Sequence, residues 1–209
     1  MSVATIPVAF WLLPAGADAA DLQVRIAELS RENGTPAFDA HVTLHVDTCS
    51  SDVDLESLVR GVAAASSPLA LVAGATRHSA AYFKALYVDL AGHRGGPVAD
   101  DAQAASLPAL RRRLAVDLLR RGAGTADAAA PLAPAPVEQA LARYLFLPHL
   151  SLLYGDLPLQ LLQQLAARHD LRGRSILFDG IAAVRPSRGQ ADLSKVAHWE
   201  VVGAQRLGR

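Results

Sequence analysis

Two short segments of the sequence pair a histidine with a hydroxyl residue two positions later. One is HVTL, with His41 and Thr43, and the other is HLSL, with His149 and Ser151. Both segments lie in apolar runs that are typical of β-strands. Because side chains alternate across a strand, each histidine shares a face with its hydroxyl, about 6.5 to 7 Å away. If the two strands face each other, two imidazoles and two hydroxyls surround one cavity.

Such a set of side chains suits displacement at phosphorus. One group must deprotonate the attacking water, and another must protonate the leaving oxygen on the opposite side. Imidazole has an ordinary pKa of about 6.5 and can do either near neutral pH. The hydroxyls of Thr43 and Ser151 can hydrogen-bond the non-bridging oxygens as charge builds on them. We therefore expect a site that needs no metal or other cofactor, because the two histidines handle the protons that a metal-bound water would otherwise manage.

His45 continues the alternation that begins at His41. Three interpretations are open: an exposed histidine at the strand end, a further group at the cavity, and a metal ligand beside His41. We favour the exposed histidine, because no cysteine or acidic residue has ligand spacing nearby. The sequence therefore predicts no metal site.

Aromatic residues could hold a nucleobase beside the phosphate. Trp11, Tyr82 and Phe83 are candidates for base stacking, although aromatic residues in strands more often belong to the core. Arg77, His78 and Lys84 stand near this aromatic segment, and contact with phosphate and exposure on the surface are equally good interpretations of them.

The composition limits the kind of partner. The chain has 209 residues, 51% of them hydrophobic, and its 20 basic and 20 acidic residues give a net charge of zero. Proteins that follow long nucleic acids normally have a basic excess, so we expect a small phosphate-bearing ligand and no long duplex. Cys49 is the only cysteine, which excludes an intrachain disulfide and a cysteine-based zinc site.

The hydrophobic periodicity predicts strands and helices without a regular βαβ rhythm, and hence an α+β fold. Its order suggests two pseudo-symmetric lobes of antiparallel sheet with flanking helices around a central cleft. We expect strands at 8–14, 41–48, 69–76, 81–90, 147–155, 175–186 and 196–207, and helices at 18–33, 52–65, 107–121, 137–146 and 157–170.

The middle of the chain has a different character. The helix expected at 107–121 carries five arginines, which we interpret as a solvated face rather than a phosphate-binding patch. Residues 122–136 are rich in Ala, Gly and Pro and predict a mobile loop. We expect a single bilobal domain over 1–209, with a variable helix and loop insertion at about 92–140.

The apolar N-terminal run is not expected to be a signal or a membrane segment. No Lys or Arg precedes Arg25, and Pro7 and Pro14 interrupt the run, which is also too short to span a bilayer. We predict a core strand here, and a cytoplasmic protein without membrane contact.

The paired motifs and their flanks resemble the two-histidine phosphoesterase superfamily. The segments FWLLP, AFDAHVTL, AYFKALYVDL, FLPHLSLLYGDL and HWEVV are similar, in order, to the branch of plant and fungal cyclic phosphodiesterases. The similarity leaves out roughly residues 92–140. Family members usually have proline before the first motif histidine, where this chain has Ala40, and the plant enzymes use several cysteines that it lacks.

The resemblance implies roles for individual residues. His41 and His149 become the acid and base pair, Thr43 and Ser151 the phosphate-binding hydroxyls, and Tyr154 a further residue that positions phosphate or water. In a regular strand Tyr154 would face away from Ser151, so a bend or strand end near Leu153 is required.

The resemblance also implies an activity: hydrolysis of 2′,3′-cyclic phosphates of small nucleotides, or of ADP-ribose 1″,2″-cyclic phosphate, in RNA metabolism. Two alternatives stay open. One is chemistry on RNA ends, as a cyclic phosphodiesterase or a 2′–5′ RNA ligase-like enzyme, and the other is a non-catalytic module that binds nucleotide or RNA.

Overall fold

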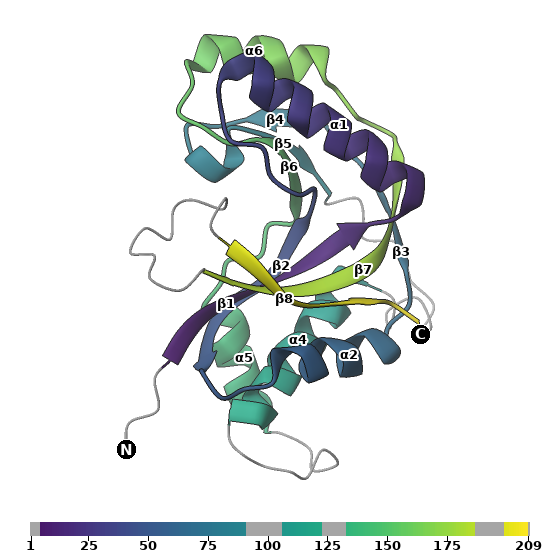
Figure 1. Ribbon diagram of the computed structural model, residues 1–209, viewed down its shortest axis with the longest axis vertical. Coiled ribbons are helices and arrows are strands. Elements are labelled where there is room, and N and C mark those ends of the chain that lie inside the picture. Colours follow the sequence, from purple (N-terminus) through teal and green to yellow (C-terminus); the bar gives the residue numbers. More distant parts are fainter. Residues whose placement is uncertain (1–4, 91–105, 123–132, 187–198, 209) are drawn as a thin grey trace.

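The strands form one antiparallel sheet in a computed structural model that describes residues 5–90, 106–122, 133–186 and 199–208 (Figure 1). The sheet has eight strands in the order β3-β7-β1-β2-β6-β5-β4, with β8 paired to β7. The strands are β1 (Thr5–Pro14), β2 (Val42–Ser50), β3 (Leu69–Val72), β4 (Thr76–His78), β5 (Leu86–Asp89), β6 (His149–Leu153), β7 (Ser175–Pro186) and β8 (Trp199–Arg206).

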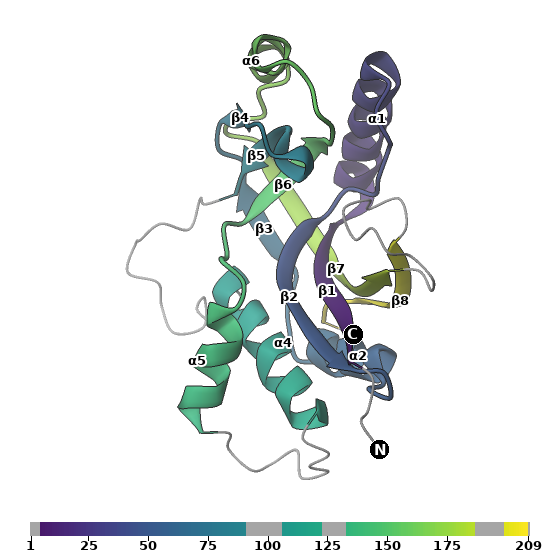
Figure 2. The ribbon, with the colours of Figure 1, turned by 90° about the vertical axis from the view of Figure 1, so that its left-hand side faces the viewer.

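The helices gather at the two ends of the molecule. Helices α1 and α6 lie at one end, and α2, α4 and α5 lie together at the other (Figures 1 and 2). They are α1 (Gly16–Asn33), α2 (Leu55–Ala64), α4 (Leu107–Gly122), α5 (Pro134–Ala142) and α6 (Leu159–Arg168), with a short 3₁₀ helix at Tyr82–Lys84. This mixture of helices with a curled antiparallel sheet confirms the predicted α+β class.

The two predicted halves of the sheet meet where the two motif strands meet. β2 pairs with β6 through a single register position, Val42 opposite Leu150. On either side of this junction the pairing is longer, between β1 and β2 and between β5 and β6. The junction therefore places both His-x-Ser/Thr segments on adjacent strands of one continuous sheet.

Local sequence explains several element boundaries. Asp54 caps α2, its carboxylate accepting a hydrogen bond from the backbone N–H of Ser57 at 2.9 Å. Helix α1 stops at Gly34, which adopts the left-handed conformation with φ 65° that glycine accepts without a steric penalty. Strand β7 covers residues 175–186, as its apolar run predicts.

The arginines of α4 bind neighbouring helices. The Arg113 guanidinium donates to the hydroxyl of Ser66 at 2.8 Å, just beyond the end of α2, and Arg121 donates to the hydroxyl of Ser57 at 3.3 Å, at its start. Arg112 forms an ion pair with Glu138 of α5. Neither a solvated face nor a phosphate patch describes these three arginines, because their contacts hold α4 against α2 and α5, whereas Arg120 forms an ion pair with Asp117 of α4 itself.

Several predicted boundaries differ from the structure. The expected strand at 69–76 is a strand only over Leu69–Val72, and β4 begins at Thr76. The helix expected at 137–146 ends at Ala142. The expected strand at 81–90 is a strand only over Leu86–Asp89, because residues 82–84 form the 3₁₀ turn. Helix α5 begins at Pro134, inside the segment predicted as a loop, since proline suits the first turn of a helix. The rest of that loop, 123–132, and residues 91–105 lie outside the described residues.

The N-terminal apolar run forms β1, in the interior of the sheet between β2 and β7. Phe10 and Leu12 on this strand are fully buried, which confirms the prediction of a core strand. None of the described helices has the length and apolar character needed to cross a membrane.

Candidate active site

A β-bulge in β2 determines which of its residues reach the motif cavity. Phe10 of β1 pairs with His45, but the next residue, Trp11, pairs with Thr43, so Leu44 is an extra residue in β2. A bulge of this kind reverses the alternation of side chains beyond it. Leu44 and His45 are therefore both buried in succession, and Val46 lies on the cavity side instead of His45.

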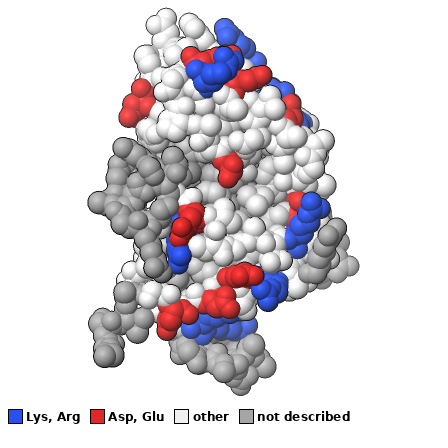
Figure 3. All heavy atoms as spheres, in the orientation of Figure 1, with Lys and Arg blue, Asp and Glu red and all other residues white. Residues whose placement is uncertain are grey.

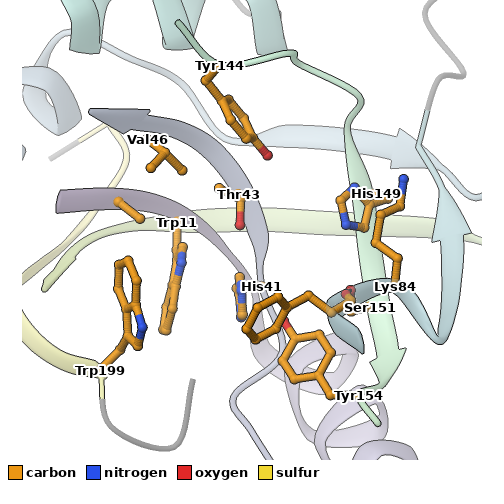
Figure 4. Close-up of a pocket in the computed structure, with 12 residues that line it drawn as sticks. Trp11, His41, Thr43, Val46, Lys84, Tyr144, His149, Ser151, Tyr154 and Trp199 are labelled. Atoms are coloured by element: carbon orange, nitrogen blue, oxygen red, sulfur yellow. The ribbon is translucent and has the colours of Figure 1, made fainter. Parts of the chain in front are cut away.

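The cavity lies over the junction of the motif strands and has a volume of about 330 Å³ (Figure 4). This size is at the lower end of the range of small-molecule sites. Its lining residues come from β1, β2, β6, β8, the 3₁₀ helix and the segments next to β2 and β6: Ala9, Trp11, His41, Thr43, Val46, Phe83, Lys84, Tyr144, His149, Ser151, Tyr154 and Trp199.

The two histidines are held in the same way. Nδ1 of His41 lies 2.6 Å from the carbonyl oxygen of Asp39, and Nδ1 of His149 lies 2.7 Å from that of Leu147. A carbonyl can only accept, so each Nδ1 carries the hydrogen of the neutral ring and each Nε2 has a free lone pair. Both rings therefore present a proton-accepting nitrogen, as proton transfer in the cavity requires.

Burial lowers the pKa of both histidines. The pKa of His41 falls to about 4, chiefly because burial disfavours its charged form, while the Asp39 carbonyl opposes the shift and His149 adds to it. The pKa of His149 is also lowered, chiefly by burial and further by the positive charge of Lys84, against the effects of the Leu147 carbonyl and Asp89. His41 is thus neutral at neutral pH.

The two motif hydroxyls differ in their present bonding. The Ser151 hydroxyl donates to the carbonyl oxygen of Phe83 at 2.9 Å. Within the described residues the hydroxyl of Thr43 makes no hydrogen bond, and it points into the cavity (Figure 4). Thr43 is therefore free to bind a ligand oxygen, whereas Ser151 must first release its carbonyl.

Tyr154 reaches the cavity because β6 ends at Leu153. The strand end that the sequence required is therefore present. The Tyr154 ring stacks on Phe38, with ring centroids 3.7 Å apart. Burial raises the pKa of its phenol, against a smaller opposite effect of a hydrogen bond with Ser151, so Tyr154 keeps its proton.

The three candidate stacking residues have different positions. Trp11 lines the cavity, but its ring already stacks on His41 at 3.9 Å between centroids, and the residue is only 6% exposed. Phe83 also lines the cavity. Tyr82 is not among the lining residues, and its ring packs against Phe83 and Tyr154. The 3₁₀ turn points the side chains of Tyr82 and Phe83 in different directions, so only Phe83 reaches the cavity.

Sequence reasoning missed several lining residues. For Lys84 the sequence does not distinguish cavity from surface, and the structure makes it the one charged side chain among the described lining residues, 4.3 Å from the ring centroid of Tyr87. Val46 has no role in the sequence patterns, and only the bulge explains its position. Trp199 belongs to the HWEVV segment of the family resemblance, which implied no site role for it. Tyr144 lies outside both motifs and has no signal in the sequence.

His45 is not the exposed residue that we favoured. It is fully buried, and both ring nitrogens are without a hydrogen-bond partner in the part of the chain that the structure describes. Its Nε2 lies 3.7 Å from an Asp47 oxygen, too far for a hydrogen bond. Burial lowers its pKa to about 4, so the ring is neutral and this contact is no ion pair at neutral pH.

The same bulge separates His45 from His41, so the structure does not support a metal site formed by these two. Across the described residues, no three His, Cys, Asp or Glu side chains lie close enough together to hold a metal.

The fold is similar to solved structures at low sequence identity. TT0787 of Thermus thermophilus aligns with a TM-score of 0.52 and 14% identity, over 97% of this chain and 98% of that one. E. coli LigT in apo form aligns with a TM-score of 0.51 and 15% identity over all of both chains. E. coli LigT complexed with 3′-AMP gives 0.50 and 14%, over 99% and 100%.

No protein-family model matches the chain, and no curated protein matches its sequence. The alignments cover 97 to 100% of this chain. The chain therefore has the fold of E. coli LigT and T. thermophilus TT0787.

Proposed function

We propose that this protein is a two-histidine phosphoesterase that hydrolyses 2′,3′-cyclic phosphates of small nucleotides to the 2′-phosphate. ADP-ribose 1″,2″-cyclic phosphate, giving the 1″-phosphate, belongs to the same substrate class. The observation that carries the proposal is the pair of histidines in one cavity. Each has Nδ1 bound to a carbonyl two residues earlier and an Nε2 to which no described residue hydrogen-bonds.

The histidines divide the proton transfers. One neutral imidazole takes a proton from water as the water oxygen attacks phosphorus. The bond from phosphorus to the 3′ oxygen breaks, and the other histidine, protonated, gives its proton to that oxygen. Burial favours the neutral form of His41 strongly, which suits the base, and leaves His149, at the more open side, as the acid.

The charge of the cavity suits a phosphodiester. Lys84 supplies one positive charge, and no acidic residue is among the described lining residues. A cyclic phosphodiester carries one negative charge, so Lys84 can neutralise it without a second cation. The free hydroxyl of Thr43 can then donate to a non-bridging oxygen, where charge accumulates during the reaction.

A small nucleotide fits better than a long nucleic acid. The cavity of about 330 Å³ accommodates a ligand of mononucleotide size. Basic and acidic side chains are interspersed on the face of the molecule in Figure 3, without a basic stripe. The solved LigT complex with 3′-AMP shows a mononucleotide on a protein of this fold, which supports the same ligand class here.

A panel of cyclic phosphates tests the proposal. Nucleoside 2′,3′-cyclic phosphates, ADP-ribose 1″,2″-cyclic phosphate and an oligoribonucleotide with a terminal cyclic phosphate are incubated with the protein, with and without a chelator. Phosphorus NMR identifies the products. We expect 2′-monophosphates from the nucleoside substrates in both conditions. Turnover of the oligonucleotide alone would favour an enzyme of RNA ends, and no turnover of any substrate would contradict the proposal.

A further inference from the structure

Tyr144 is a cavity residue that none of the motif chemistry uses. It lies in the segment between α5 and β6, and its side chain extends into the cavity with the hydroxyl directed toward the space between Thr43 and His149 (Figure 4). Among the described residues its hydroxyl makes no hydrogen bond. Burial raises the pKa of the phenol, so the hydroxyl is protonated at neutral pH and can donate.

The backbone around Tyr144 is held by one arginine of α4. Nη2 of Arg111 donates to the carbonyl oxygens of Leu141 at 2.5 Å and of Tyr144 at 2.6 Å. These carbonyls lie at and beyond the C-terminal end of α5, where backbone acceptors lack partners within the helix. A single guanidinium therefore fixes the turn from which the Tyr144 side chain departs.

The Arg111 guanidinium also contacts aromatic rings of this turn. It lies 5.7 Å from the ring centroid of Tyr144 and 4.8 Å from that of Phe146. Cation–π contact at such distances restricts the ring as well as the backbone. Arg111 itself does not line the cavity, so it makes no direct contact with a ligand there, and Tyr144 is the lining residue that it binds.

From this arrangement we propose that Tyr144 is a substrate-binding residue whose hydroxyl donates to a non-bridging phosphate oxygen. Arg111 is its positioning residue. Thr43 and Tyr144 then approach the phosphate from different elements, β2 and the segment after α5. The inference rests on the proposed function for the identity of the substrate, but phosphate binding itself can be tested without turnover.

Equilibrium binding of 2′-AMP and of inorganic phosphate, followed by calorimetry, is the first test. Tyr144→Phe removes only the hydroxyl and keeps the ring that Arg111 contacts. We expect it to weaken the binding of both ligands about 10- to 100-fold, as the loss of a hydrogen bond to a charged group predicts. Unchanged affinity for both ligands, or no binding by the unmodified protein, would overturn the inference.

Arg111→Met tests the positioning role, with Arg112→Met as its matched control. Arg112 stands on the same helix and also contacts α5, through Glu138, but does not touch the Tyr144 turn. We expect Arg111→Met to weaken 2′-AMP binding as much as Tyr144→Phe, and Arg112→Met to leave it unchanged. Arg111→Lys, which keeps the charge but loses the forked donor, should recover part of the affinity.

The double variant separates positioning from a general structural effect. If Arg111 acts through the Tyr144 hydroxyl, Arg111→Met adds no further loss in a Tyr144→Phe background. Additive losses would overturn the positioning role, and circular dichroism checks that each variant is folded. If Arg111→Met does not fold, Arg111→Lys replaces it in the double-variant cycle. Its loss of 2′-AMP affinity should then also disappear in the Tyr144→Phe background. Cyclic phosphate hydrolysis is measured in parallel. If the protein binds 2′-AMP but hydrolyses no cyclic phosphate, the proposed function is contradicted, while the binding data still test the role of Tyr144.

Discussion

The two motif histidines share a local geometry and differ in their surroundings. In both, Nδ1 is bound to the carbonyl of the residue two positions earlier. His41 immediately precedes β2 in the middle of the sheet, is 5% exposed and is covered by the Trp11 ring. His149 starts β6, is partly exposed, and meets Tyr87 edge-on with ring centroids 5.6 Å apart.

The difference shows that a repeated tetrapeptide fixes orientation but not acidity. The alternation of the strand and the carbonyl contact are local, so both copies have them. Burial comes from the strands and rings around each copy. It is the main cause of the lowered pKa of both histidines, and it brings the pKa of the more buried His41 to about 4. Two chemically identical groups can therefore take opposite roles in one reaction.

Replacement of either histidine should have the largest effect. We expect His41→Ala and His149→Ala each to lower kcat/KM for a 2′,3′-cyclic nucleotide by about 10²- to 10⁴-fold, the usual contribution of a proton-transfer group. The double variant should lose little more than the worse single variant, because both groups serve one step. Steady-state kinetics measures this.

His169→Ala is the control for the histidine variants, because His169 ends α6 and does not line the cavity. It should keep full activity. Retention of activity in either motif variant would show that the shared geometry has no catalytic meaning.

The two motif hydroxyls should also differ in their importance for the reaction, with a larger loss of kcat when the Thr43 hydroxyl is removed than when the Ser151 hydroxyl is removed. Thr43→Val should reduce kcat about 10²-fold, the typical effect of a lost donor to a developing negative charge. Ser151→Ala should reduce it only about tenfold, because its hydroxyl is engaged by the Phe83 carbonyl at 2.9 Å. Thermal unfolding should show a loss of stability for Ser151→Ala and none for Thr43→Val. Equal losses of kcat in the two variants would contradict the predicted difference between the hydroxyls.

Much of the site could be predicted from sequence because it depends on strand alternation. His41 with Thr43, and His149 with Ser151, needed only period-two geometry and the expectation that the two strands meet. The structure places all four around one cavity, and Tyr154 joins them through the predicted strand end at Leu153. The α+β class followed from the order of apolar periods in the same way.

The rest depended on features that have no local pattern. The bulge at Leu44 reverses the faces of His45 and Val46, and nothing in an alternating run announces one extra residue. Tyr144 lines the cavity from a turn that Arg111 of α4 binds, a contact over 33 positions. Arg111 belongs to the arginine-rich helix, whose composition alone does not indicate which neighbour each arginine binds.

Removal of the ring above His41 should make the two halves more alike. Trp11→Leu lets water reach His41, and its pKa should rise from about 4 toward the ordinary 6.5, because burial is the main cause of the shift. A base must be neutral, so the acidic limb of the kcat/KM profile should move to higher pH by about 1 unit. Trp199→Leu removes a cavity residue that does not stack on His41 and should leave this limb in place; a profile unchanged in Trp11→Leu would contradict the role of the stacking.

The smallest expected effect concerns His45, which is buried like His41 but lies outside the cavity. Its replacement should change the stability of the protein and not its activity. Its pKa is about 4 in the folded protein and 6.5 ordinarily, so between these values the unfolded chain binds more protons. The contribution to stability is therefore complete above pH 6.5 and is lost as the pH falls toward 4, by about 1.4 kcal/mol per pH unit.

His45→Leu removes this loss together with two unpaired ring nitrogens, and leaves the ion pair of Asp47 with Arg143 at 3.0 Å in place. Denaturant unfolding at pH 7 and pH 5 should show a gain of about 1 to 3 kcal/mol that is larger at pH 5, with kcat/KM unchanged. A gain that is equal at both pH values would mean that burial does not depress the pKa of this ring, and would weaken the same explanation for His41.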